Sequence, residues 1–140
     1  AMGGTCARME HPEIAVSDVT LANVKDDPVF GALPNPFPAM HWHGVEVTDL
    51  PPHAEVLGRS SLCSNQAMRV KDRAWGVQFH PELEPGTLRG WMQDSANLNA
   101  AASWLGSEAV AWDFVQTSEA QVETFLERSA AMYRGFRSVW

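Results

Sequence analysis

Short segments of alternating apolar and polar residues dominate the first part of the chain. Residues 14–21 read Ile-Ala-Val-Ser-Asp-Val-Thr-Leu, which has the period of a half-buried strand. Proline and glycine mark loops at residues 26–31 and 34–38. The same pattern predicts further strands at residues 40–43 (ending in a turn at Gly44) and 54–60, and a hairpin of 67–70 and 75–79 around the polar turn 71–73.

The spacing of apolar residues changes from strand-like to helical after residue 82. Residues 85–95 place Leu88, Trp91 and Met92 on one helical face, and 97–105 form a second helix that stops at Gly106. Strands followed by helices indicate an α/β or mixed-sheet domain. A third helix is expected after a cap at Thr117 or Ser118, with a buried stripe of Val122, Phe125, Leu126 and Met132.

Composition and charge narrow the classes of partner. The 140 residues fit one domain, and the net charge of −7 makes nucleic acid and anionic membrane surfaces poor partners. No apolar run approaches the roughly 20 residues that a membrane span needs. The cysteines, Cys6 and Cys63, favour a reducing cytoplasm and lack the spacing of a zinc site, so we expect no metal.

The segment with the clearest chemistry is residues 75–82, Trp-Gly-Val-Gln-Phe-His-Pro-Glu. A strand delivers His80 and Glu82 to its end, and Pro81 stops further strand pairing. A carboxylate beside an imidazole fixes the tautomer and stabilises the imidazolium, as in the general-base half of a nucleophilic triad. By spacing alone, a histidine two residues before a glutamate is usually part of an ordinary polar loop.

The octapeptide resembles, almost letter for letter, the GVQFHPE signature of class I glutamine amidotransferases. A second segment, residues 42–57, resembles the family's pocket segment, its LP turn and the strand that follows. The resemblance implies an α/β fold, a flavodoxin-like mixed sheet flanked by helices, present only as its C-terminal part. It covers residues 1–95, which leaves 96–140 as a helical C-terminal extension that packs on the sheet or forms a partner surface.

The resemblance assigns roles to residues by position. His80 and Glu82 would be catalytic, and Trp42, His43, Gly44 and Val45 would contact the substrate's α-amino and α-carboxylate groups. A glycine lets the main chain approach a ligand closely. Trp42 and Val45 could equally be core residues, and we expect His41 and His53 to be surface or satisfied histidines.

The family's nucleophile, a cysteine in a Gly-x-Cys-x-Gly turn, is not matched by Cys6 or Cys63. We therefore expect the nucleophile on an upstream segment and expect these 140 residues to be inactive alone. The resemblance implies glutamine as substrate, no cofactor, and an ammonia-accepting synthetase as a possible partner.

Two other functions remain open. Residues 50–55 and 63–68 also resemble γ-glutamyl peptide hydrolases of the same superfamily, which use the same triad. The second alternative is a binding or regulatory domain that has lost its nucleophile.

Overall fold

The computed structural model describes residues 3–140; the first two residues of the expected 1–95 domain lie outside this range. Five strands precede four helices, so the predicted order of strands followed by helices is confirmed. The elements are β1 (Thr5–Leu21), β2 (Phe37–Asp49), β3 (Ala54–Arg59), β4 (Ala67–Val70), β5 (Ala74–Val77), α1 (Thr87–Met92), α2 (Ser95–Leu105), α3 (Glu108–Glu119) and α4 (Val122–Arg137).

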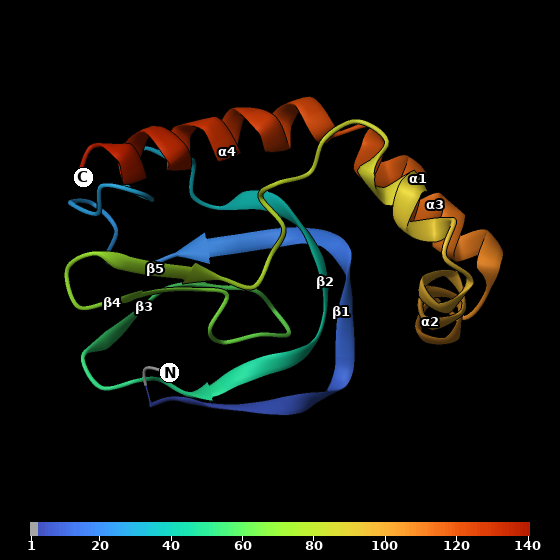
Figure 1. The fold of residues 1–140 in the computed structure, drawn as a ribbon, viewed down its shortest axis with the longest axis horizontal. Coiled ribbons are helices and arrows are strands. Elements are labelled where there is room, and N and C mark those ends of the chain that lie inside the picture. Colours follow the sequence, from blue (N-terminus) through green and yellow to red (C-terminus); the bar gives the residue numbers. More distant parts are fainter. Residues whose placement is uncertain (1–2) are drawn as a thin grey trace.

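The strands form one sheet in the order β2-β1-β3-β4-β5, and every neighbouring pair is antiparallel. Most of β1 pairs with β2, with Ile14 opposite Trp42, while its last residues, Thr20 and Leu21, pair with β3. The register of β1 against β2 shifts between Arg8 and Glu13. β1 and β2 bend together, which gives the curled sheet of Figure 1.

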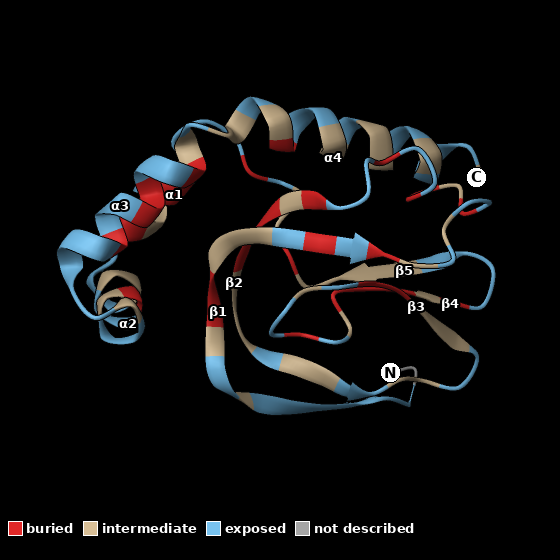
Figure 2. Ribbon diagram, turned by 180° about the vertical axis from the view of Figure 1, so that it is seen from behind, coloured by how far each residue is buried: buried red, intermediate tan, exposed pale blue. Residues whose placement is uncertain are grey.

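The first two strands are longer than their patterns predict. We expected a strand to begin at residue 14, but β1 begins at Thr5. We also expected a turn at Gly44, but β2 continues to Asp49 because Val45 and Glu46 pair with Arg8 and Ala7. Residues on these extensions are mostly exposed (Figure 2), so burial leaves no alternating pattern in the sequence.

The remaining strands lie where they were predicted, except that β5 ends at Val77 and not at residue 79. β3 lies within the expected 54–60, and β4 and β5 form the expected hairpin, with Val70 opposite Ala74. Lys71 in the turn adopts the left-handed conformation, with φ of 55°. The hairpin brings the chain to residue 78 beside the strands that carry the site.

The helices differ from prediction after Gly106. α2 ends there as expected, with Gly106 left-handed at φ 98°. Thr117 and Ser118 do not cap a helix but lie inside α3, which the apolar pattern did not predict. Ser118 instead donates a hydrogen bond to the Phe114 carbonyl. α4 begins after Gln121 without a side-chain cap; Phe125 in its predicted stripe is buried, but Leu126 is exposed.

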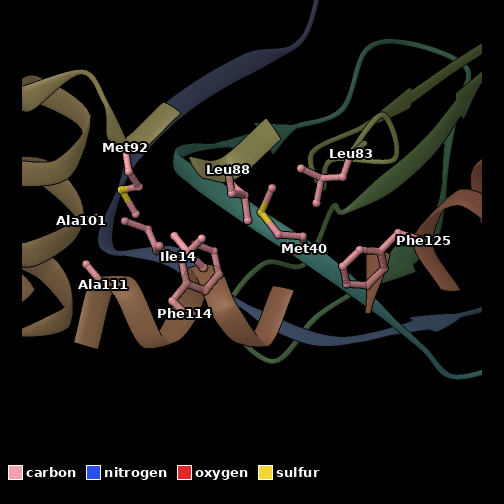
Figure 3. Packing of buried hydrophobic residues seen from close by; sticks show 10 residues of the cluster. Ile14, Met40, Leu83, Leu88, Met92, Ala101, Ala111, Phe114 and Phe125 are labelled. Atoms are coloured by element: carbon pink, nitrogen blue, oxygen red, sulfur yellow. The ribbon is translucent and has the colours of Figure 1, made fainter. Parts of the chain in front are cut away.

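One apolar cluster joins the bend of the sheet to the helices (Figure 3). Ile14 and Met40 from β1 and β2 meet Leu88 of α1, Phe114 of α3 and Phe125 of α4. Leu83 belongs to the same cluster, so this packing holds the loop after β5 against the helices. A second cluster, which includes Phe30, Phe37 and Phe79, lies under α4. Among the described residues, no helix is long and apolar enough to cross a membrane.

Candidate active site

One side-chain contact and one main-chain hydrogen bond hold the loop after β5 against β2. Phe79 is buried, and its ring packs edge-on against Phe37 with centroids 5.7 Å apart. The backbone N–H of His80 donates to the Met40 carbonyl at 2.9 Å. His80 is therefore held beside β2 by apolar packing and by a main-chain hydrogen bond.

His80 and Glu82 face each other. The Nδ1 of His80 lies 2.7 Å from Oε1 of Glu82, with Pro81 between the two residues in the chain. A carboxylate only accepts, so Nδ1 carries the proton and Nε2 presents its lone pair to the other side. The imidazole side chain is 26% exposed and the carboxylate 58%, so a second group can approach Nε2.

Aromatic side chains position the His80 ring. Trp91 of α1 packs edge-on against it, with ring centroids 5.1 Å apart, and Trp91 in turn packs edge-on against Trp42 at 5.7 Å. The Trp42 carbonyl lies 3.4 Å from Nε2 of His80. A carbonyl accepts only, so this contact becomes a hydrogen bond when Nε2 carries a proton.

The four residues expected to bind substrate have different environments in the structure. The side chain of Trp42 packs in the core against Phe114, while its carbonyl faces His80. Gly44 and Val45 lie on β2 beside the shift in its register with β1, and Val45 is 49% exposed. Trp42, His43 and Gly44 line a shallow hollow of about 140 Å³ that is completed by Pro12, Ile14, Ala100 and Trp104.

His43 does not face His80. Its Nε2 lies 3.5 Å from Oε2 of Glu13 and 3.2 Å from the Gln66 amide nitrogen, while its Nδ1 lies 3.1 Å from the Val45 carbonyl. The side chain is only 12% exposed. Its geometry suits an internal contact that shapes the backbone at Val45.

A buried polar cluster behind β2 was not predicted from the sequence. Glu13, His41 and Gln66 are each at most 1% exposed. Ser17 and Ser60 both donate to the Glu13 carboxylate, at 3.0 and 2.9 Å. The alternation of His41 and His43 around Trp42 was the available signal, because residues two apart on a strand share a face.

His41 and His53 were both expected to be surface or satisfied histidines, and the outcome differs between them. His41 is fully buried, so it is not a surface histidine, and only its Nε2 has a partner, the Ser17 carbonyl at 3.3 Å. His53 is exposed, which confirms the surface position as one of its two expected alternatives.

Burial and charge shift the pKa values inside this cluster. Burial raises the pKa of Glu13, but the contacts with His43, His41 and the two serine hydroxyls outweigh it, so the pKa lies below its ordinary value. Burial lowers the pKa of His41, and the nearby Glu13 only partly opposes this. Glu13, His41 and His43 also present donor atoms within 4.8 Å of one another, close enough to hold a metal ion.

The two cysteines are free thiols outside the His80 contacts. Cys63 is buried, as expected of a small core residue, and its Sγ accepts a hydrogen bond from Gln78 at 2.8 Å. Burial raises the pKa of the Cys63 thiol, with the charges of Glu46 and Glu13 adding to the effect. Cys6 is exposed on β1. Neither environment is that of an activated nucleophile.

Comparison with known proteins identifies the family. The model of "Glutamine amidotransferase class-I" matches residues 1–95. The chain is 35% identical over 82 residues to a subunit of the glutamine-hydrolyzing GMP synthase of Pyrococcus abyssi, a match that covers 58% of this chain and 43% of the relative. The chain therefore spans less than half the length of this curated relative.

Solved structures extend the likeness in fold to the helices. A glutamine amido transferase from Methylobacillus flagellatus matches with a TM-score of 0.79 and 19% identity, over 98% of this chain and 56% of that one. A glutamine amidotransferase from Thermotoga maritima matches with a TM-score of 0.71 and 22% identity, over 96% and 56%. Together with the family model, which covers more than half of the chain, these findings establish that the chain belongs to the class I glutamine amidotransferases.

Proposed function

We propose that this chain supplies the general base and its orienting carboxylate for hydrolysis of the glutamine side-chain amide. The supporting observation is the 2.7 Å contact between Nδ1 of His80 and Oε1 of Glu82, which leaves Nε2 directed away from the carboxylate. The nucleophile would be a cysteine on a polypeptide segment outside these 140 residues. Cys6 and Cys63 do not fit that role, because one is exposed on a strand and the other is buried against Gln78.

The reaction divides into two proton-coupled halves. Nε2 of His80 takes the thiol proton, and the thiolate attacks the amide carbon to give a tetrahedral oxyanion. Collapse of this intermediate breaks the C–N bond, and the proton on Nε2 passes to the leaving nitrogen as ammonia forms. Nε2 then removes a proton from water, which attacks the γ-glutamyl thioester and releases glutamate and the thiol.

The Trp42 carbonyl would stabilise the protonated state of His80. It lies 3.4 Å from Nε2, where it can accept a hydrogen bond only from the imidazolium. Glu82 holds the opposite nitrogen, so both partners favour the charged ring that forms after proton transfer. The exposed backbone at Gly44 and Val45 would contact the α-amino and α-carboxylate groups of the substrate. His43 would shape that backbone from behind through its contact with the Val45 carbonyl.

The ammonia acceptor is proposed from the relatives. The Pyrococcus abyssi relative is named as one subunit of a GMP synthase, so we propose a synthetase subunit or domain as the partner of this chain. The free thiols of Cys6 and Cys63 favour a reducing compartment, and we place the protein in the cytoplasm.

Glutamine hydrolysis by the natural protein tests the proposal. The protein would be compared as wild type, as His80→Asn, and as a control in which the exposed His53 is changed to asparagine; the 140-residue chain alone should be inactive. We expect His80→Asn to lower kcat by about 10²–10⁴-fold and the control to retain activity. Activity of the 140-residue chain that His80→Asn abolishes would contradict an external nucleophile.

The same assay separates the alternative functions. Release of glutamate from a γ-glutamyl peptide, with little action on glutamine, would identify a γ-glutamyl peptide hydrolase. Absence of both activities in the natural protein, with or without a synthetase partner, would identify a non-catalytic binding domain.

A further inference from the structure

Three electron-pair donors converge behind β2, apart from the His80–Glu82 pair. Oε2 of Glu13 lies 3.5 Å from Nε2 of His43 and 3.9 Å from Nδ1 of His41. For comparison, the donors of a tetrahedral zinc site lie about 3.4 Å apart, given bonds of about 2.0–2.1 Å. The Glu13–His43 separation matches this spacing, the Glu13–His41 separation is about half an ångström longer, and all three donor atoms lie within 4.8 Å of one another.

The outer nitrogen of each imidazole fixes which nitrogen faces the cluster. Nε2 of His41 contacts the Ser17 carbonyl at 3.3 Å, and Nδ1 of His43 contacts the Val45 carbonyl at 3.1 Å. Carbonyls accept only, so these nitrogens carry the protons and the inner nitrogens of both rings present lone pairs. Metal-binding histidines are oriented in this way, by a backbone carbonyl on the ring nitrogen that does not bind the metal.

Two buried atoms of the cluster have no hydrogen-bond partner, and one nitrogen has more neighbours than it has hydrogens. Nδ1 of His41 is buried and has no hydrogen-bond partner. The amide nitrogen of Gln66 lies within hydrogen-bond distance of three groups, Glu13, His43 and Ser60, at 2.7, 3.2 and 3.1 Å, although it has only two hydrogens. The amide oxygen of the same side chain is buried without a partner.

We propose that Glu13, His41 and His43 bind one divalent transition-metal ion of the zinc class, with the Gln66 amide oxygen as fourth ligand. Rotating the Gln66 amide by half a turn would exchange its nitrogen and oxygen. The oxygen that now lacks a partner would then face the three donors. The ligand set of two imidazoles and a carboxylate suits zinc. The expectation of no metal rested only on cysteine spacing, which does not bear on these residues.

The ion would act as a structural brace. Glu13 belongs to β1, His41 and His43 to β2, and Gln66 immediately precedes β4, so one ion would join three segments of the sheet. It would bind on the face of β2 opposite the Trp42 side chain, where Glu13, His41 and Gln66 are each at most 1% exposed. The inference does not depend on glutamine hydrolysis, because His80 and Glu82 are not ligands.

Metal binding to the natural protein tests the inference. After removal of metals with a chelator, the protein would be titrated with Zn²⁺ and Co²⁺, with stoichiometry, the Co²⁺ absorption spectrum and the midpoint of thermal unfolding as readouts. We expect one ion per chain, d–d bands of tetrahedral intensity, no thiolate charge-transfer band, and a higher unfolding midpoint with metal.

Conservative variants connect binding to these residues. Glu13→Gln and His43→Gln should each weaken Zn²⁺ binding by more than about 100-fold, because even loss of an outer partner of a metal ligand costs about 10–100-fold. His53→Asn, which removes an exposed imidazole, should bind as the wild type does. If the buried variants do not fold, the stoichiometry and Co²⁺ spectrum of the wild type decide the question. No bound metal, a thiolate band, or equal binding by His43→Gln and wild type would overturn the inference.

Discussion

In the loop after β5, the imidazole of His80 and the carboxylate of Glu82 are joined by a 2.7 Å contact across a single proline. The His80 ring also packs edge-on against Trp91. Removing the charge of Glu82 while keeping an acceptor should therefore lower activity without abolishing it. We expect Glu82→Gln to reduce kcat for glutamine hydrolysis by about 10–100-fold, less than the about 10²–10⁴-fold for loss of the base in His80→Asn. Steady-state rates of the natural protein check this order. A larger loss for Glu82→Gln than for His80→Asn would contradict these roles.

Trp91 should matter for both stability and the position of His80. Its ring packs edge-on against His80 and Trp42, and it is partly buried. We expect Trp91→Ala to lower the free energy of unfolding by about 2–3 kcal/mol, somewhat less than for a fully buried tryptophan. Denaturant unfolding measures this. The control is Trp140→Ala, at a ring that is 74% exposed, for which we expect a loss below about 1 kcal/mol. Equal losses would show that the packing of Trp91 has no special importance.

Gly135 on α4 permits close contact with the loop between β1 and β2. A Cβ at this position would overlap the Pro28 carbonyl oxygen and lie 2.8 Å from its carbon. Gly135→Ala should therefore destabilise the protein by about 1–3 kcal/mol, despite the better helix propensity of alanine. Gly90→Ala in α1 is the matched control, since nothing lies within 4 Å of a Cβ there, and it should stabilise by about 0.5–1 kcal/mol. Thermal and denaturant unfolding of both variants gives the two signs; stabilisation by Gly135→Ala would show that α4 does not dock as described.

The two thiols should differ in reactivity. Cys6 is exposed, whereas Cys63 is buried with a raised pKa, so we expect one rapid iodoacetamide adduct near pH 8 in the folded protein and two under denaturing conditions. Mass spectrometry with peptide mapping identifies the modified residue. Because the folded pKa of Cys63 is raised above its ordinary value of 9.0, its contribution to stability is complete below that pH and is lost as the pH rises further. Rapid modification of Cys63 in the folded protein would contradict its burial.

The sequence alone predicted the family, the order of strands followed by helices, and the pairing of His80 with Glu82. The octapeptide ending in His80-Pro81-Glu82 is contiguous in the chain, so the spacing of its residues is known before the fold is. The hairpin 67–77 and the helix stop at Gly106 were predictable for the same reason, because turn and cap residues act over a few positions. Helix α3 was missed because its buried residues, including Ala111 and Phe114, face a core whose position the local pattern does not reveal.

Only the tertiary structure decided which distant residues meet. The extensions of β1 and β2 are held by pairing between Arg8 and Val45, a relation that no local period encodes. The sequence placed His43 in the segment that resembles the family's pocket, and only the fold shows its ring beside Glu13. Glu13, His41 and Gln66 come from three segments, and each is ordinary in its own stretch of sequence. Their convergence depends on strand register and on burial, which arise only when the sheet closes around them.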